Sequence, residues 1–304
     1  MKNLVLGASG QIGHALTKRL IHDCQEVVGT YCSHNLYSDL PCRIFKADVS
    51  DQTSVNNIIS DYVPDVIFVP AGYTHVDGCE KEPKSKLINV NGINHITKAA
   101  RNIKHKSPLI VIFSSDYVFD GTGGPYSEED IPNPISEYGK QKLLAEHLLA
   151  TSYNNFCIVR TNWVFGPDPQ EKNFVVRLIN NLKDGQAATV PFDEWGTPTY
   201  TVDIAEATIK LIKYFGLQRS RTNRIVNIAG GKWVNKYEFS LSICDVFGLD
   251  RRLVTGVKSS ELKRPAARPL LSGLKVGKIE ELIGQRMQHY EDALMKYKKL
   301  LSYT

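Results

Sequence analysis

Long apolar segments and paired cysteines are both missing from this sequence of 304 residues. No apolar run approaches the roughly 20 residues that a membrane-spanning helix needs, so we expect no membrane partner. The cysteines lack Cys-x-x-Cys or metal-site spacing, so we predict free thiols in a reducing cytosol. Residues 1–4 lead straight into the first predicted strand and leave no room for a signal peptide. We therefore expect a soluble, cytoplasmic protein.

A strong excess of either charge is missing too. Lysine and arginine total 37 against 32 aspartates and glutamates, a net charge of +5. The short basic clusters at 251–252 and 296–299 are typical of solvated faces, so we predict no nucleic-acid partner. No acidic cluster indicates a metal site. Apolar residues make up 42% of the chain, which suits one large globular domain or two linked ones.

Three evenly spaced glycines follow the first apolar strand, residues 4–6, and precede an amphipathic helix. In a dinucleotide-binding turn, Gly7 allows the tight turn, Gly10 admits the pyrophosphate and Gly13 lets the helix pack on its strand. The same glycines could serve a plain strand-to-helix turn. We predict that the turn binds the cofactor, through Gly7, Ser9, Gly10, Gln11, Ile12 and Gly13.

The second predicted strand, residues 27–31, ends without the acidic residue that usually holds the ribose of NAD. Ser33, His34 and Asn35 follow and leave room for a 2′-phosphate, with Arg43 or Lys46 as candidate cations. This pattern favours NADPH as the cofactor, with NADH as the alternative.

The ends of the next strands supply the other predicted cofactor contacts. Asp48 and Val49 follow a third strand, where Asp48 could meet the adenine or cap the next helix. Small residues after the strand at 65–69 permit close contact with a cofactor. A long helix predicted at 83–101 carries Asn89, which could hold the helix or a water. The further contacts are Ala71, Gly72, Tyr73, Thr74 and Asn89.

A hydroxyl residue and a Tyr-x-x-x-Lys pair follow the apolar strand at 110–113. Tyr138 and Lys142 lie four residues apart, so they share one face of a helix. We predict that Tyr138 donates a proton, that Lys142 lowers its pKa and binds a cofactor ribose, and that Ser115 holds the substrate carbonyl. The plain alternative is a surface helix with a packed tyrosine and a solvated lysine.

Strands alternating with helices of ten or more residues predict an α/β fold, a Rossmann-type doubly wound parallel sheet. Its ligand should lie at the carboxyl ends of the strands, where Gly7, Ala71 and Ser115 fall. We expect residues 1–165, with about 201–228, to form this domain. A smaller C-terminal substrate-binding lobe should take about 166–200 and 229–304.

Motifs along nearly the whole chain resemble the extended short-chain dehydrogenase/reductases, and among them the dTDP-4-dehydrorhamnose reductase family. The matching segments are 7–13, 74–77, 114–119, 138–142, 160–164, 173–174, 195–199 and 268–269 with Ser272. The resemblance implies NAD(P)H-dependent reduction of the C4 ketone of a nucleotide-linked 4-keto-6-deoxy sugar, in dTDP-L-rhamnose biosynthesis. It also leaves room for a homodimer.

Motif matches carry further roles onto this chain. The resemblance implies that Thr74 and Val76 lie near the nicotinamide and that Arg268 approaches the nucleotide or its diphosphate. Trp163 would contact the sugar, or serve packing alone. The substrate contacts implied in this way are Val76, Asp116, Trp163, Asn173 and Arg268. Ser115 stands where the family usually has threonine, and Pro70 where it often has asparagine.

Three rival functions use similar sequences. A sugar-nucleotide dehydratase would carry an Asp-Glu pair after the hydroxyl residue, whereas Tyr117 follows Asp116 here. A sugar-nucleotide epimerase shares the Tyr/Lys machinery, although the segments at 163 and 195–199 fit a reductase better. Residues 114–132 are also similar to the NADP-binding regulatory beta subunit of methionine adenosyltransferase, which departs from the reductase pattern around the segment matching 160–164.

Overall fold

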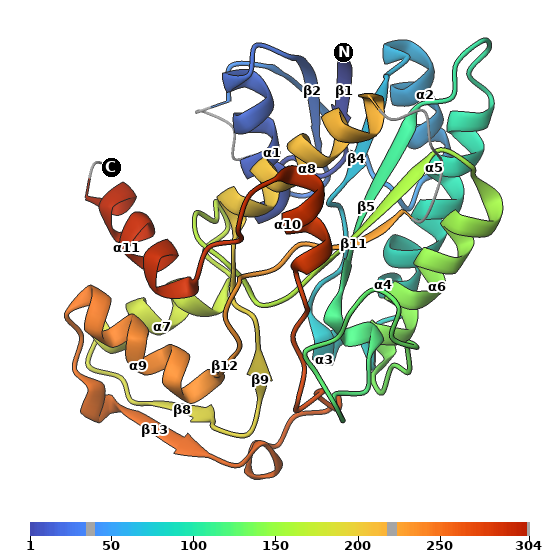
Figure 1. Ribbon diagram of the computed structural model, residues 1–304. Helices are drawn as coiled ribbons and strands as arrows, with labels where there is room; N and C mark the ends of the chain where they lie inside the picture. The colour runs from blue at the N-terminus through green and yellow to red at the C-terminus, as the bar shows by residue number, and fades with distance from the viewer. Residues whose placement is uncertain (35–39, 218–223, 303–304) are drawn as a thin grey trace.

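The computed structural model describes residues 1–34, 40–217 and 224–302, and a parallel sheet runs through its centre (Figure 1). In the described residues this sheet has seven strands in the order β11-β6-β5-β4-β1-β2-β3. The strands are β1 (Lys2–Val5), β2 (Glu26–Tyr31), β3 (Arg43–Lys46), β4 (Val66–Val69), β5 (Leu109–Ser115), β6 (Phe156–Thr161) and β11 (Ile225–Asn227). The predicted Rossmann-type fold is confirmed.

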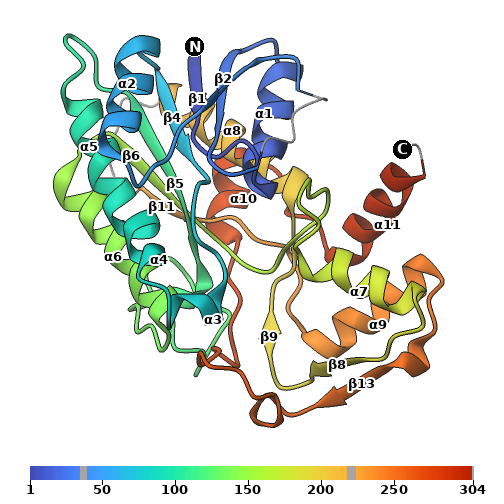
Figure 2. The same cartoon turned by 180° about the vertical axis from the view of Figure 1, so that it is seen from behind.

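Helices cover both faces of the sheet (Figures 1 and 2). One face packs against α1 (Gln11–His22), α8 (Thr201–Leu217) and α10 (Gly277–Ile283). The other packs against α2 (Gln52–Tyr62), α5 (Gly92–Arg101) and α6 (Glu137–Ser152).

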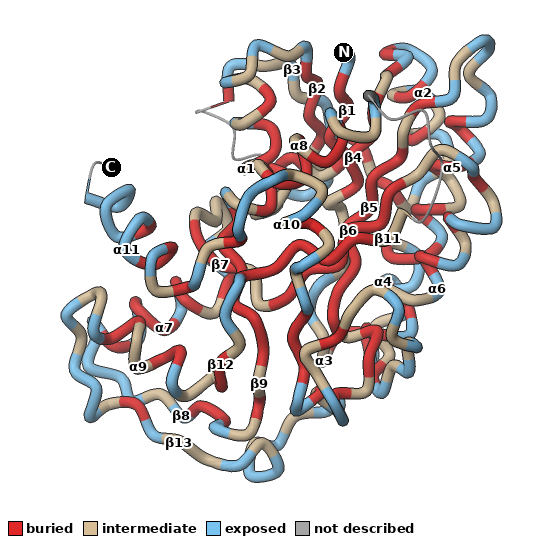
Figure 3. Tube along the Cα trace, viewed as in Figure 1, coloured by how far each residue is buried: buried red, intermediate tan, exposed pale blue. Residues whose placement is uncertain are grey.

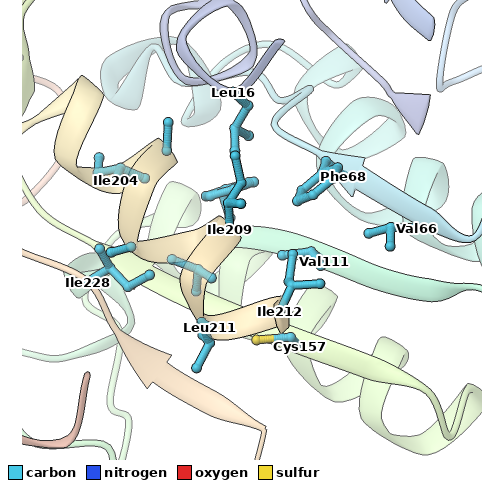
Figure 4. Close-up of a cluster of buried hydrophobic side chains, with 14 of the residues drawn as sticks. Leu16, Val66, Phe68, Val111, Cys157, Ile204, Ile209, Leu211, Ile212 and Ile228 are labelled. Atoms are coloured by element: carbon cyan, nitrogen blue, oxygen red, sulfur yellow. The ribbon is translucent and has the colours of Figure 1, made fainter. Parts of the chain in front are cut away.

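Strand β5 shows why a continuous apolar run suits this place in the fold. Its successive side chains point to opposite faces, and both faces are covered. Val111 joins the cluster shown in Figure 4, beside Leu16 of α1 and Ile209 of α8. Ile110 and Ile112 join the cluster on the other side of the sheet. The strand therefore carries Ser115 to the sheet edge on a rigid, buried support.

The helix predicted at 83–101 contains a π-helical turn in the structure. After the short helix α3 (Val76–Cys79), the chain forms α4 (Lys84–Lys86), a π-helical turn η1 (Leu87–Asn91) and then α5. A π-turn accommodates an extra residue in the helix and is often found at functional sites. Here it contains Asn89, which is buried and turned toward the loop after β4. The predicted helix is confirmed from Lys84 to Arg101, with a π turn inside it that the sequence did not predict.

A smaller lobe lies beside the carboxyl edge of the sheet. Its helices are α7 (Phe174–Lys183), α9 (Lys236–Phe247) and α11 (Tyr290–Leu301). Its strand pairs are β10 (Thr199–Tyr200) with β7 (Val164–Phe165), β12 (Val234–Asn235) with β9 (Trp195–Gly196), and β13 (Val254–Val257) with β8 (Ala188–Pro191). The 3-10 turns η3 (Arg251–Leu253) and η4 (Ser259–Glu261) also occur in this part of the chain, whereas the 3-10 turn η2 (Asp116–Val118) follows strand β5 of the sheet. A separate apolar cluster around Phe239 forms the core of this lobe.

The predicted division of the chain into two lobes stays a prediction, and the contacts of α8, β11 and α10 bear on its boundaries. Helix α8 and strand β11 return to the sheet, as expected for 201–228. Helix α10, expected in the smaller lobe, instead packs on α8 and β11, with Ile279 fully buried in the core of the sheet. Figure 3 shows buried residues concentrated along the central strands. None of the helices in the described ranges is both long and apolar enough to cross a lipid bilayer.

Candidate active site

The glycine turn between β1 and α1 is tightly packed at two of its three glycines. Gly7 has a φ of +90°, and a Cβ there would lie 2.9 Å from the Cα of Ala71. A Cβ on Gly13 would lie 2.1 Å from the carbonyl oxygen of Gly7, whereas one on Gly10 would make an ordinary contact at 3.5 Å. The close helix packing predicted for Gly13 therefore matches the geometry, and the backbone at Gly10 is the approachable one.

Helix α1 presents its N-terminus at this turn. Gly10 is the N-cap residue, and among the described residues no side chain caps the helix. The first amides of a helix lack intrahelical partners and carry partial positive charge, so they attract phosphate. The turn thus has the room and the donors that a cofactor pyrophosphate requires.

A cavity of about 560 Å³ opens at the glycine turn. This size falls within the range of small-molecule sites. Nine predicted cofactor residues line it: Gly7, Ser9, Gly10, Asp48, Val49, Ala71, Gly72, Tyr73 and Thr74. Gln11 and Ile12 do not line it: Gln11 Nε2 donates to the carbonyl oxygen of Gly166 at 3.4 Å, and Ile12 packs into the core. Pro70 lines the same cavity.

The end of β2 supplies the rim of this cavity. Ser33 and His34 both line it, with Ser33 Oγ and His34 Nδ1 2.8 Å apart. Asn35 lies outside the described residues. Arg43 and Lys46 line a different hollow between β3 and α2. The geometry therefore does not favour these two cations as ligands of a 2′-phosphate in the cavity.

Asp48 does not cap the helix that follows it. Its Oδ1 accepts hydrogen bonds from the amide and hydroxyl of Ser50, at 2.8 and 2.7 Å. Asp51 caps α2 instead, accepting from the amides of Thr53 and Ser54. Of the two roles that the sequence left open for Asp48, capping is excluded, and its place on the cavity wall favours the adenine side.

The three predicted catalytic residues come together where β5 meets α6. Ser136 starts α6 by accepting a hydrogen bond from the amide of Gly139 at 3.2 Å. The ammonium of Lys142 lies 5.8 Å from the ring centroid of Tyr138 and donates to the carbonyl oxygen of Phe113 at 2.9 Å.

Two further contacts connect the trio to each other and to the cavity. The Ser115 hydroxyl interacts with that of Tyr138 through a side-chain hydrogen bond. A Cβ on Gly72 would lie 3.4 Å from the Lys142 ammonium, so Lys142 adjoins the cavity wall. Tyr138 and Ser115 are 8% exposed. Lys142 is only partly exposed, and its ammonium is bonded to Phe113, which argues against the alternative of a solvated lysine on a surface helix.

Burial decides the charge states of Tyr138 and Lys142. Burial raises the pKa of Tyr138, as does the nearby Asp116, and the bond to Ser115 opposes them. Burial lowers the pKa of Lys142 to about 8, against the attraction of Glu146. The sequence predicted that Lys142 lowers the pKa of Tyr138, whereas in the protein alone this pKa is raised, because burial disfavours the phenolate. The phenol keeps its proton at neutral pH, as a proton donor must.

Asp116 follows Ser115, the predicted catalytic serine, and is 1% exposed. Its carboxylate accepts hydrogen bonds from Ser115 Oγ at 2.9 Å, from Asn162 Nδ2 and from Ser272 Oγ. Burial raises the pKa of Asp116 to about 6. Asn162 in turn accepts from the amide of Thr197 at 2.6 Å. This geometry suits Asp116 to orienting Ser115, and the predicted contact of Asp116 with the substrate stays a prediction.

Arg268 forms an ion pair with Asp77 of helix α3. Its guanidinium lies 2.9 Å from Asp77 Oδ2, and the amide of Ala266 donates to the other oxygen of Asp77 at 3.1 Å. Val76, the residue before Asp77, begins α3. A role for Arg268 at a nucleotide or diphosphate would have to compete with this ion pair.

Trp163 and Asn173 belong to the smaller lobe. Trp163 has a left-handed φ of +36°, and the Lys236 ammonium lies 5.0 Å from its ring centroid. Asn173 caps α7 by accepting from the amide of Val176 at 3.1 Å, and its amide donates to Gly166. Both polar ends of Asn173 are therefore used in holding the loop, while Trp163 keeps a partly exposed ring.

Asn89 acts through the backbone of the loop after β4. Its Oδ1 accepts from the amide of Tyr73 at 2.8 Å, and its Nδ2 donates to the Tyr73 carbonyl oxygen at 3.0 Å. Nδ2 also donates to Gln141 at 2.9 Å. Asn89 thus shapes the cavity wall at Tyr73 instead of reaching a ligand itself.

Sequence reasoning assigned no role to three residues that organise the site. Asn162 and Ser272 hold Asp116, and both lie in segments that carried the family resemblance. Gln170 donates to the carbonyl oxygen of Ser9 at 3.0 Å and lines the cavity. Its position in an irregular loop carried no signal. In the described part of the chain, no group of three or more potential metal ligands is placed to bind an ion.

Comparison with known sequences places the chain among sugar-nucleotide enzymes. The model of the RmlD substrate binding domain matches residues 1–302. The spore coat polysaccharide biosynthesis protein SpsK of Bacillus subtilis is 34% identical over 97% of this chain and 96% of its own. A dTDP-4-dehydrorhamnose reductase of Aggregatibacter actinomycetemcomitans is 32% identical, over 96% of each chain. The methionine adenosyltransferase 2 subunit beta of Xenopus tropicalis is 28% identical over 93% of this chain and 83% of its own.

Solved structures show the same architecture. A dTDP-4-dehydrorhamnose reductase from Clostridium acetobutylicum superposes with a TM-score of 0.84 at 31% identity, covering 99% of this chain and all of its own. The Bacillus anthracis reductase in complex with NADP gives a TM-score of 0.83 at 25% identity, covering 98% and 99%. With its family model matched over residues 1–302, this chain belongs to the dTDP-4-dehydrorhamnose reductase family of sugar-nucleotide reductases, as its motifs predicted.

Proposed function

We propose that this protein is an NAD(P)H-dependent oxidoreductase that reduces the C4 ketone of a nucleotide-linked 4-keto-6-deoxy sugar. One observation supports the proposal: Ser115, Tyr138 and Lys142 come together, and Lys142 lies beside Gly72, which lines the cavity at the glycine turn. A reductase needs a proton donor beside the cofactor, and this arrangement supplies one.

The side chains divide the work of protonating the ketone. Tyr138 retains its proton at neutral pH and donates it to the carbonyl oxygen as the ketone is reduced. Ser115 turns its hydroxyl from Asp116 to the same oxygen, since a hydroxyl rotates freely about its C–O bond. Lys142 brings positive charge to the developing phenolate and adjoins the wall of the cavity. The bound nicotinamide would supply the hydride.

The cofactor assignment rests on the glycine turn and the rim of the cavity. Among the described residues, those at 31–34 present no carboxylate that would favour the ribose of NAD over a 2′-phosphate. The related reductase of Bacillus anthracis holds NADP. We therefore propose NADPH as the preferred cofactor, with NADH as the alternative.

The finer substrate follows from the relatives. Those of Aggregatibacter and Clostridium are named dTDP-4-dehydrorhamnose reductases. We propose the same substrate here, in dTDP-L-rhamnose synthesis in the cytoplasm. A homodimer is a further expectation.

The test is oxidation of NADPH with a dTDP-4-keto-6-deoxy sugar, followed at the absorbance of the reduced nicotinamide. Tyr138→Phe should lower kcat by about 10²- to 10⁴-fold, the usual contribution of a general acid, while cofactor binding persists. Tyr153→Phe is the matched control, because it removes a tyrosine hydroxyl at the other end of α6, bonded to Pro108. Equal loss in both variants would contradict the assignment.

A regulatory role is the second candidate, favoured by the relative named methionine adenosyltransferase 2 subunit beta. Such a protein would use the same glycine turn and cavity to bind the nucleotide without turning it over. Tight NADPH binding without oxidation by any 4-keto-6-deoxy sugar nucleotide would favour this role.

A further inference from the structure

Helix α6 and strand β6 share an ion pair that is almost completely buried. Arg160 Nε and Nη2 donate to the two carboxylate oxygens of Glu146, at 3.0 and 2.7 Å. Both side chains are 2% exposed. The guanidinium also lies 5.2 Å from the ring centroid of Phe119. Glu146 is therefore held in one orientation by a two-pronged contact.

Stability alone does not explain such a pair. Removing two charges from water is costly, and well-packed apolar residues often replace a buried pair without loss of stability. Its position offers another reason. Tyr138, Lys142 and Glu146 follow one another at intervals of four residues, so they form one stripe on α6. The stripe runs from the proton donor, through the ammonium, to the anchored carboxylate.

We propose that Glu146 is a positioning residue of the active site, fixed by Arg160, whose negative charge keeps the Lys142 ammonium charged beside Tyr138. The proposal rests on the proposed function only for the role of Lys142 in catalysis. Its electrostatic part concerns the protein itself.

The surroundings of Lys142 show why a fixed carboxylate matters. Burial works against the ammonium, and the charges acting on it are Glu146, one turn along the helix, and Cys79 of α3. The thiol of Cys79 has a pKa raised by burial, so it is neutral at pH 7. Among the described residues, Tyr138 also lies beside Lys142 and is kept neutral, and the charge of Arg160 is paired with Glu146. Glu146 is thus the anion that acts on Lys142 at neutral pH.

The direct test is an NMR titration of the lysine side-chain signals, with Lys142 assigned by its loss in Lys142→Arg. In the wild type we expect a pKa of about 8. In Glu146→Gln it should fall by about one to two pH units, because an opposite charge one turn away is lost. Glu146→Asp keeps the charge and should stay within about half a unit of the wild type. An unchanged titration in Glu146→Gln overturns the proposal, as does an equal shift in both variants.

A second variant covers the case in which Glu146→Gln leaves Arg160 unpaired and prevents folding. Glu146→Leu with Arg160→Met replaces the pair by apolar residues of similar size. The Lys142 signal should still titrate below the wild-type value, because the acting carboxylate is gone. A wild-type titration in this double variant refutes the proposal.

Activity gives a separate readout. The alkaline limb of the kcat profile should move to lower pH in Glu146→Gln by the same amount as the NMR titration, and Glu146→Asp should restore it. A limb that stays in place while the NMR signal moves overturns the catalytic part. If the wild type does not reduce any keto sugar, the proposed function fails, and the titration still decides the electrostatic part.

Discussion

Replacing Asp116 by asparagine removes one buried charge and keeps the shape of the side chain. The wild-type carboxylate accepts from Ser115, Asn162 and Ser272. These three bonds favour the ionised form, yet burial outweighs them and raises the pKa to about 6 from 3.8. The folded protein therefore prefers Asp116 protonated, and ionising it lowers stability.

The size of this effect follows from linkage. Each pH unit between the folded and unfolded pKa values corresponds to about 1.4 kcal/mol, so the difference amounts to about 3 kcal/mol. The folded state binds the extra proton between the two pKa values. The contribution of Asp116 is thus most favourable at low pH, falls as the pH rises through about 4 to 6, and is constant above.

Urea unfolding at about pH 4 and about pH 7 measures this difference. The free energy of unfolding of Asp116→Asn, relative to the wild type, should rise by about 2 kcal/mol between these two values, because part of the full difference is already lost at pH 4. If the introduced asparagine amide makes a poorer hydrogen bond than the carboxylate did, the stability of the variant shifts by a constant amount that does not depend on pH. Asp120→Asn is the control: hydrogen bonds from Thr122 and Asn133 hold the pKa of Asp120 below its usual range. Its carboxyl therefore titrates mainly below pH 4, and the relative stability of Asp120→Asn should change little between the two pH values. A relative stability of Asp116→Asn that stays flat with pH would refute the reasoning.

Further substitutions separate packing from binding at the cofactor cavity. Gly13→Ala places a Cβ 2.1 Å from the Gly7 carbonyl oxygen and should lower stability by about 3 kcal/mol in urea unfolding. Gly10→Ala meets that oxygen at 3.5 Å, so it should fold normally and still weaken NADPH binding at least tenfold in a fluorescence titration; wild-type affinity would contradict a phosphate site there. Asn89→Leu leaves the Tyr73 backbone without its partners and should raise the KM for NADPH, with stability lower by about 1–3 kcal/mol. An unchanged KM would show that the loop holds its shape without Asn89.

The parts of the fold that sequence predicted well depend on local patterns. Apolar runs on strands covered on both faces and the spacing of glycines can be recognised within a short stretch of sequence. The strands and the turn at Gly7 were found where they were predicted. The stripe of Tyr138 and Lys142 follows from helical periodicity alone. Parallel topology then brings Ser115 to the same edge, because the carboxyl ends of all strands meet there.

The features of the site that sequence reasoning missed depend on burial and on contacts between residues that are far apart in the chain. Whether a tyrosine pKa rises or falls is decided by desolvation against charge, and the Tyr-x-x-x-Lys spacing contains only the second. The pairing of Arg268 with the segment at Asp77 joins positions that are far apart in the chain. The π-turn that turns Asn89 toward Tyr73 lies inside the predicted helix, and the sequence pattern did not indicate it.

The orientation of Ser115, the proposed catalytic serine, depends on segments that are far apart in the chain. Ser115 is oriented by Asp116, and Asp116 is held by Ser272, which lies 156 residues further along. The carbonyl oxygen of Ser272 accepts from Trp233 Nε1 at 2.6 Å, which connects it to the smaller lobe. On the proposed function, a sugar nucleotide that displaced Trp233 would also displace Ser272 and alter the hydrogen bonds that Asp116 accepts. The position of Ser115 at the proposed ketone would then depend on contacts made by remote parts of the substrate, which is how remote binding energy can act on a reacting centre.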